Sequence, residues 1–467
     1  MHGINTIIGK VVAFPSAKQA VSKNLRIVTF FNASHYWGGQ LEEVASSKGV
    51  NRGLKTNTES RFYALILQAL SVKDHKAALM ELCSRDGAQR KINGLTPVNE
   101  DVVATVFDLS RWRMTDQIIR ICKPLVDIIG DVESRDSTLA DCMLQLIWAH
   151  RAVINSPLME GDDPAFADHA KNMLNVHFHA MNTDVHWLAL FLHPLCRKLA
   201  VSTARHSRKL VDAYRISLDI VQRWKWSKEM AENLTRDLKA YHNGEAPFKG
   251  GKSDGKDWWK SLVVNVNSHP LKALAIKLFS IVPHAAEVER FFSNLGGIQS
   301  VKWSNLTIPH MQTFGTLRNH YVRQLHEIAI AAGKPTRRKH AHMHTPIEGG
   351  GIDVGRADEL LKDVLWTPQL LTEQNGANTT ETTAAEPSPE EVDAEFDKLS
   401  TQVVSPVDGD GLAASVPVSE VYNLSTLDDI RAGKAGASNV DDELELVSRT
   451  SAPDSWDPAS LLLSLGV

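Results

Sequence analysis

The chain has 467 residues, 43% of them hydrophobic, and a net charge of −4, a composition sufficient for two or three folded domains. The sequence excludes a membrane span, because no stretch approaches the roughly 18 consecutive apolar residues that one requires. It also lacks the charged start and long apolar run of a signal peptide. The four cysteines are far apart and form no Cys-x-x-Cys pair. This argues against a zinc knuckle or a disulfide framework and favours a reducing, intracellular compartment.

The charge is unevenly distributed along the chain. Residues 351–467 contain 23 acidic and 6 basic side chains, whereas residues 1–350 contain 32 acidic and 45 basic ones. A basic body favours a polyanionic partner such as DNA, and an acidic tail is typical of a solvated segment. The excess over 350 residues is modest, so charge alone does not establish nucleic-acid binding.

Residues 1–35 carry short apolar runs that fit either a helix or a strand. From about residue 57 to 240 the periodicity is helical. Its first apolar stripe, at i, i+3, i+4 and i+7, consists of Phe62, Leu65, Ile66 and Ala69. Thr138 and Asp141 have the spacing of a capping box before a further apolar run. No repeat of 30–50 residues is present, which argues against a solenoid.

Residues 243–257 are a loop by composition, and a compact segment follows from Trp258 to about residue 332. Its last apolar stripe consists of Met311, Phe314, Leu317, Tyr321 and Leu325. The residues that follow position 333 are basic and His-rich, and residues 374–467 are rich in Thr, Ala, Ser, Pro and acidic residues, which together set the predicted tail at 333–467. This composition buries too little apolar area to offset chain entropy, so we expect a disordered acidic tail.

The segment from Trp258 to Asn319 resembles the C-terminal dimerisation region of hAT (hobo–Activator) DNA transposases. It opens on Trp258–Trp259, continues with Pro270-Leu-Lys-Ala-Leu-Ala, and closes on Leu317-Arg-Asn. Between them lies the most specific motif, whose matching positions are Ser280, Pro283, Ala286, Glu289, Arg290, Phe292, Ser293 and Gly296. Two positions depart from the family pattern: Ala285 replaces a Ser, and Asn319 lies one residue early.

Weaker similarity extends upstream, so that the resemblance covers about residues 1–325. His2-Gly-Ile-Asn is similar to part of the family's Cys-x-x-His-x-Ile-Asn motif, and Leu188–Pro194 is similar to its Leu-Ala-x-x-Leu-x-Pro segment. The resemblance implies a mainly α fold, in which an all-helical insertion domain (40–245) interrupts a ribonuclease H-like α/β fold. Of the latter, residues 1–35 would be a remnant, and residues 258–332 would be the hAT dimerisation region.

The family's chemistry uses two Asp and one Glu that hold two divalent metal ions, Mg²⁺ or Mn²⁺. Glu289 matches the Glu. Both Asp residues precede the Cys-x-x-His motif, and this chain begins at the His of that motif. Asp101, Asp108 and Asp141 match no motif and lie in helical patterns. We therefore expect no metal site and no cofactor, with Glu289 a vestigial residue on a helix surface.

The resemblance also indicates candidate DNA contacts. Arg61–Phe62 is similar to a Thr-Arg-Trp motif whose Trp stacks on a flipped base, and Phe62 retains an aromatic face. The basic run Arg337, Arg338 and Lys339 is a second candidate. The alternatives are an ordinary amphipathic pair and a solvated linker. For His340, His342 and His344 we expect no metal site, because they lie in the predicted tail.

The expected function is protein dimerisation by a nuclear, transposase-derived protein with DNA as a further partner. The residues expected at the dimer interface are Trp258, Trp259, Leu271, Leu274, Leu278, Phe291, Phe292 and Leu317. One alternative is an active cut-and-paste transposase, if a longer product of the gene supplies both Asp residues. Another is a fragment without function.

Overall fold

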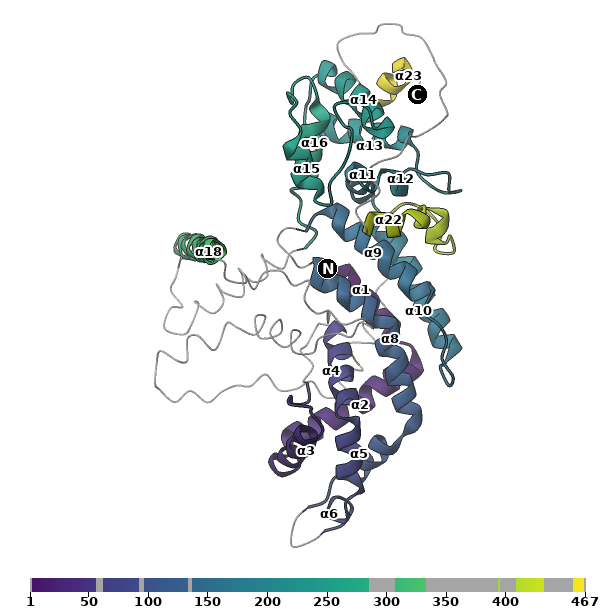
Figure 1. Cartoon of the computed structure of the whole chain (residues 1–467), viewed down its shortest axis with the longest axis vertical. Coiled ribbons are helices and arrows are strands. Elements are labelled where there is room, and N and C mark those ends of the chain that lie inside the picture. Colours follow the sequence, from purple (N-terminus) through teal and green to yellow (C-terminus); the bar gives the residue numbers. More distant parts are fainter. Residues whose placement is uncertain are drawn as a thin grey trace. The chain divides into compact units, whose positions relative to one another are not determined.

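The computed structural model describes residues 2–55, 62–91, 96–132, 137–284, 307–332, 409–431 and 457–465, together with residue 394. Within these ranges every regular element is a helix and there is no strand (Figure 1). The prediction of a mainly α fold is therefore confirmed. Among the described helices, none is both long and apolar enough to cross a membrane.

The chain divides into two compact units. Unit 1 comprises residues 1–135, 155–173 and 284–403, and unit 2 comprises residues 136–154, 174–283 and 404–467. One helix, α10 (Pro164–Met181), supplies residues to both ranges. The units therefore interleave along the sequence, and each is assembled from three separate segments.

Unit 1 contains two helices of 24 residues, α8 and α18, and several shorter ones. Its described elements are α1 (His2–Val12), α2 (Pro15–Ala33), α3 (His35–Ser47), α4 (Phe62–Asp74), α5 (Lys76–Ser84), α6 (Asp86–Gln89), α7 (Glu100–Phe107), α8 (Leu109–Val132) and α18 (Ile308–Ala331). Helices α1, α2 and α4 pack against α8 and bury the apolar face of each. The segment whose periodicity left helix and strand undecided, residues 1–35, is thus helical and belongs to this packing.

A chain of buried hydrogen bonds connects helices inside unit 1. The guanidinium of Arg111 is buried and donates to Asn24 Oδ1 at 2.5 Å and to the Thr105 carbonyl at 2.9 Å. Asn24 in turn donates to Thr115 Oγ1 at 3.1 Å. These bonds connect α2 to α8 in the apolar interior, where a polar group without a partner is costly.

Unit 2 is built from α9 (Leu139–Ile154), the end of α10, α11 (Asp184–Leu192), α12 (Arg197–Ala200), α13 (Leu210–Arg223), α14 (Lys228–Asn243), α15 (Gly255–Ser261) and α16 (Pro270–Leu278). Its core is aromatic. Phe191 stacks on Trp187 and contacts the edge of Tyr241, which packs against Trp259. The Tyr241 hydroxyl donates to the Phe191 carbonyl at 3.0 Å, so even the polar end of this ring is satisfied inside the core.

Two C-terminal segments also belong to unit 2. Residues 409–431 contain η3 (Val418–Glu420), η4 (Leu424–Thr426) and α22 (Leu427–Arg431), and residues 458–465 form α23 (Pro458–Leu465). The expectation of disorder fails at 409–431, because Val418, Tyr422 and Leu427 of this segment are fully buried. An average over the acidic composition concealed one short stretch with apolar residues at helical spacing. We call residues 409–431 the docked segment.

Candidate functional site

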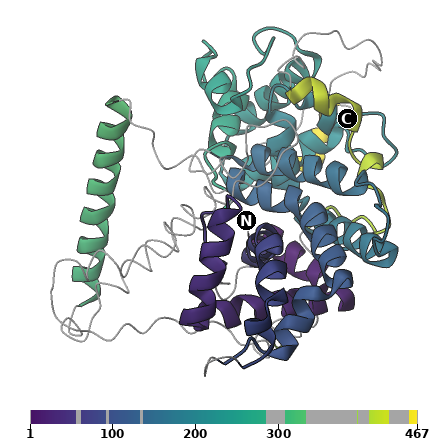
Figure 2. The same cartoon turned by 60° about the horizontal axis from the view of Figure 1, so that its bottom comes forward.

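Helix α18 presents an apolar stripe to solvent. The side chains of Phe314, Leu317, Tyr321, Leu325 and Ile328 are between 47% and 65% exposed. Among the described elements, α18 has no extensive packing contact with another helix. Figure 2 shows α18 as one continuous helix. Successive members are three or four residues apart, so they share one face of the helix, as the sequence pattern predicted.

The other residues expected at a dimer interface are placed differently. Trp258, Trp259, Leu271, Leu274 and Leu278 are buried inside unit 2 itself. The Trp259 indole N–H donates to the Leu192 carbonyl at 2.8 Å, which ties α15 to the end of α11. Phe291 and Phe292 lie outside the described residues. Of the predicted interface residues that the structure describes, Leu317 alone is exposed.

The predicted catalytic and DNA-contacting residues fall mostly outside the described ranges. Glu289, Arg61 and the basic run Arg337, Arg338 and Lys339 are among them, as are His340, His342 and His344. Phe62 is the first residue of α4 and is half-buried. The described residues contain no group of three or more His, Cys, Asp or Glu side chains placed to hold a metal ion.

The three aspartates without a family motif have local structural roles. Asp108 precedes α8, accepts from the Arg111 amide at 3.2 Å and pairs with Lys23 at 2.6 Å. The hydrogen bond from Lys23 is the main reason that the pKa of Asp108 lies far below its usual range. Asp101 is exposed in the first turn of α7, where the helix dipole stabilises a negatively charged side chain.

Asp141 completes the capping box predicted from its spacing to Thr138. Its carboxylate accepts from the Thr138 amide at 2.9 Å, and Thr138 Oγ1 accepts from the Asp141 amide at 3.2 Å. The capping-box prediction is therefore confirmed. This carboxylate fixes the start of α9, which is a structural role.

A buried Cys–His pair in unit 2 is not an activated nucleophile. Cys196 Sγ lies 3.4 Å from His193 Nδ1, and both side chains are buried. Burial raises the pKa of the Cys196 thiol and lowers the pKa of His193. Both shifts favour the neutral thiol and imidazole, whereas nucleophilic catalysis needs a thiolate that substrate can reach. The pair therefore belongs to the core.

A second candidate site is the face of α10 that holds the docked segment. Asn175 and His179 are one turn apart on one side of α10, and Asn182 directly follows the helix, with its backbone N–H bonded to the Phe178 carbonyl at 2.9 Å. Asn175 donates to the carbonyls of Ala414 and Val416, the latter at 2.9 Å. The sequence contained this stripe, but three polar residues at helical spacing normally indicate a solvated face.

His179 makes two polar contacts, and both partners are hydrogen-bond acceptors. Its Nδ1 lies 2.8 Å from Asp410 Oδ2, and its Nε2 lies 2.8 Å from the Val416 carbonyl oxygen. An imidazole donates from both nitrogens only when it is protonated, so this geometry requires a positively charged ring. Burial by itself lowers the pKa of His179, but the bonds to Asp410 and Val416 and the charge of Asp410 outweigh it and raise that pKa.

Asp410 is the matching anion. Burial by itself raises its pKa, but hydrogen bonds from His179 and Asn182 outweigh burial, and the net pKa lies below the usual range. The side-chain Nδ2 of Asn182 donates to Asp410 Oδ2 at 2.9 Å, and Asn182 Oδ1 accepts from the Tyr422 hydroxyl at 2.6 Å. Both ends of the Asn182 amide are therefore used by the docked segment.

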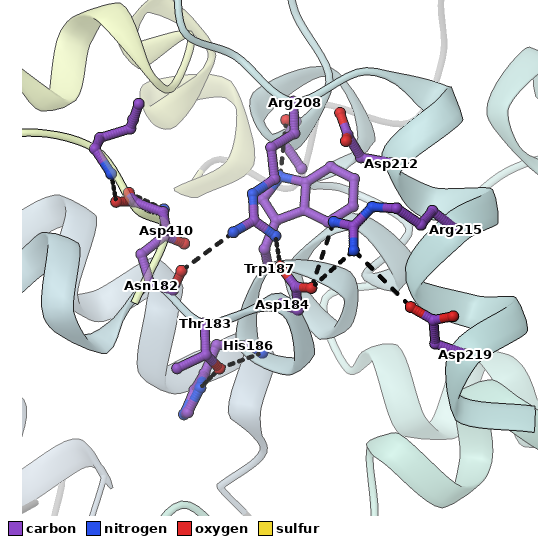
Figure 3. A network of polar contacts seen from close by, with 12 residues as sticks. Asn182, Thr183, Asp184, His186, Trp187, Arg208, Asp212, Arg215, Asp219 and Asp410 are labelled. Carbon is purple, nitrogen blue, oxygen red and sulfur yellow. Dashed lines mark hydrogen bonds and ion pairs between the residues drawn. The ribbon is translucent and has the colours of Figure 1, made fainter. Parts of the chain in front are cut away.

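Beside this face, a surface network fixes the start of α11 (Figure 3). Thr183 caps the helix by accepting from the His186 amide at 3.4 Å. Asp184 pairs with Arg208 at 2.7 Å and with Arg215 at 3.4 Å, and the Arg208 guanidinium lies over the Trp187 ring. The Asp184–Arg215 pair is exposed on both sides, and such a pair contributes little stability individually. The role of the network here is to hold residues 182–187, and with them Asn182, in place.

No protein family, curated protein or solved structure matches this chain. The family resemblance therefore rests on the motif residues of the sequence itself.

Proposed function

We propose that this chain is a transposase-derived protein that associates with a second copy of itself through α18. The observation that carries the proposal is the exposed apolar stripe of that helix. A stripe of large apolar side chains without a partner is the usual sign of a surface that binds another protein.

The spacing of the stripe suits helix-on-helix packing. Phe314, Tyr321 and Ile328 recur every seven residues, and Leu317 and Leu325 lie between them. This is close to the pattern by which two helices bury a shared apolar seam. The 24 residues of α18 span about 36 Å, enough for two copies to pack over several turns.

The family ancestry remains a proposal that rests on the motifs. In the hAT family the helical insertion and the C-terminal region pack together. Two segments with hAT-like sequence, Leu188–Pro194 and the Trp258–Trp259 pair, are in contact in unit 2 through the Trp259–Leu192 hydrogen bond. This contact supports the descent of the unit from a ribonuclease H-like transposase with a helical insertion.

Binding, rather than DNA cleavage, is the activity we propose. Among the family's three metal ligands, the motif match assigns Glu289, which lies outside the described residues. The basic excess of residues 1–350 supports DNA as a further partner and a nuclear location. Affinity for duplex DNA that arises from this charge should fall steeply as salt is added.

Sedimentation of the full chain tests self-association. We expect a dimer for the wild type and a monomer for Leu325→Arg, because the substitution places a charge in the buried seam. Gln312→Arg adds the same charge to an exposed residue on the opposite face of α18, and this control should remain a dimer. A wild-type monomer, or equal dissociation by both variants, contradicts the proposal.

The enzyme alternative has its own test. Incubation of the chain with duplex DNA and Mg²⁺ or Mn²⁺ should give no cleavage. Metal-dependent nicking that Glu289→Gln abolishes would establish the active transposase instead.

A further inference from the structure

The docked segment contacts unit 2 in the manner of a bound peptide. Its partners lie on α9, α10 and α12 and in the loop between α12 and α13, whereas 125 residues separate the segment from the preceding part of unit 2. The backbone of the segment pairs with the rest of the unit at only a few points. These include the Asp410 amide with the His179 carbonyl at 3.1 Å and the His206 amide with the Glu420 carbonyl at 2.8 Å.

Recognition on the helix side is polar and specific. Asn175 and His179 bind backbone carbonyls of the segment, which fixes its path without selecting side chains. His179 and Asn182 together bind the Asp410 carboxylate, and Asn182 also binds the Tyr422 hydroxyl. The site therefore selects an acidic residue and a tyrosine twelve positions apart.

Shape adds a third requirement at Gly409. A Cβ at this position would lie 2.3 Å from the His179 carbonyl oxygen, so the backbone of the segment approaches the end of α10 more closely than a side chain allows. This contact covers carbonyls that the last turn of α10 leaves without helical partners.

One aromatic contact and one ion pair complete the recognition of the segment. Tyr422 packs edge-on against Phe178 of α10, with ring centroids 5.9 Å apart. At the far end of the segment, Asp428 forms two bonds with Arg151 of α9, at 2.6 and 3.2 Å. The segment is thus held along its length by side chains of α9 and α10 and by Asn182.

We propose that this surface of unit 2 is a peptide-recognition site, and that residues 409–431 are its built-in ligand. The site accepts a peptide with a Gly-Asp pair followed twelve residues later by Tyr, in an extended path that ends in short helical turns. The docked segment competes in cis with any such peptide, including the same segment of a second copy. This site is separate from α18, so it does not depend on self-association through that helix.

The test uses the full chain and a fluorescent peptide of residues 405–433. In the chain carrying Asp410→Ala and Tyr422→Ala, which we call the disabled chain, the built-in ligand loses its two recognised side chains. Asn175, His179 and Asn182, which bind the ligand, are unchanged. We expect the peptide to bind this variant at least about tenfold more tightly than it binds the wild type, because the competitor in cis is weakened.

Three matched changes make the result specific. Adding His179→Ala to the disabled chain should abolish peptide binding. A peptide with Asp410→Asn should bind at least about tenfold more weakly, because a bond to a charged group is lost. A peptide with Ser425→Ala is the control, since Ser425 is exposed and bonds only within the segment. Equal binding to wild-type and disabled chains, or no binding to either, overturns the proposal.

A second measurement avoids substitutions in the segment. Protease sites inserted among residues 374–390 and 436–450 allow the docked segment of the wild-type chain to be cut free at both ends after purification, apart from α23, which packs against α13. We expect the released segment to co-elute with the body and to be displaced by excess peptide 405–433. Separation immediately on cutting, or retention that the peptide does not reverse, overturns the proposal.

Discussion

The substitution Tyr422→Phe should weaken docking of residues 409–431 while leaving their apolar contacts intact. The phenylalanine ring keeps its edge-on contact with Phe178, but the bond from the hydroxyl to Asn182 Oδ1, 2.6 Å long, is lost. Asn182 is fully buried, so its carbonyl oxygen is left without that donor. An unsatisfied buried acceptor costs about 1–3 kcal/mol.

Amide hydrogen exchange measures this cost locally. The amides of Val421 and Tyr422 are bonded to the Val418 carbonyl at 3.0 and 2.9 Å, so they exchange only when the turn opens. A loss of about 1–3 kcal/mol corresponds to exchange faster by about 5- to 150-fold. These two amides should therefore exchange faster in Tyr422→Phe than in the wild type.

Tyr214→Phe is the matched control. Tyr214 is buried on α13 in the same unit, and its hydroxyl makes no hydrogen bond with the described residues. Exchange at Val421 and Tyr422 should be unchanged in this variant. If Tyr422→Phe alters exchange by less than about twofold, or if the control accelerates it equally, the hydrogen bond to Asn182 does not hold the segment.

Three further predictions concern unit 2. Because docking raises the pKa of His179, protonated His179 stabilises the docked state fully below pH 6.5, and this stabilisation is lost as pH rises through the raised pKa. Because docking lowers the pKa of Asp410, ionised Asp410 stabilises the docked state fully above pH 3.8, and this stabilisation is lost as pH falls through the lowered pKa. Peptide affinity for the disabled chain, followed by anisotropy, should therefore be highest between these values and should fall in alkali; constant affinity from pH 6 to 9 refutes the charged pair. Gly409→Ala should speed exchange across the docked segment, because its Cβ meets the His179 carbonyl, and unchanged protection would contradict the close approach. Trp259→Phe should destabilise unit 2 by about 1–3 kcal/mol in urea unfolding, since the Leu192 carbonyl loses its donor, and an unchanged transition would argue against that bond's importance.

The helical character of the chain could be predicted because its apolar residues recur with the period of a helix. The capping box of Thr138 and Asp141 was equally readable, since capping depends on local spacing alone. Residues 1–35 were ambiguous for a physical reason. Short apolar runs bury well as either a helix or a strand, and packing of α1 and α2 against α8 decides between them.

The candidate sites were only partly readable. The stripe of α18 was visible, but its exposure was not, because periodicity is the same for a buried and a solvent-facing seam. The sequence likewise did not separate Trp259, which is buried in unit 2, from residues of an interface. The docked segment was missed because composition was averaged over the tail. Val418, Val421 and Tyr422, at i, i+3 and i+4, were the local signal that an average removes.

The long separation between α10 and its ligand has a consequence for synthesis on the ribosome. Asn182 and Tyr422 are 240 residues apart, so at 5–20 residues per second the helix face waits about 12–48 s for its partner. During that interval the face is exposed to water and to the folding machinery of the cell. Asn175, His179 and Asn182 are well hydrated when exposed, but Phe178, whose ring packs against Tyr422 in the folded unit, belongs to the same face. The nascent protein therefore waits with an apolar surface that chaperones can cover until residues 409–431 are made.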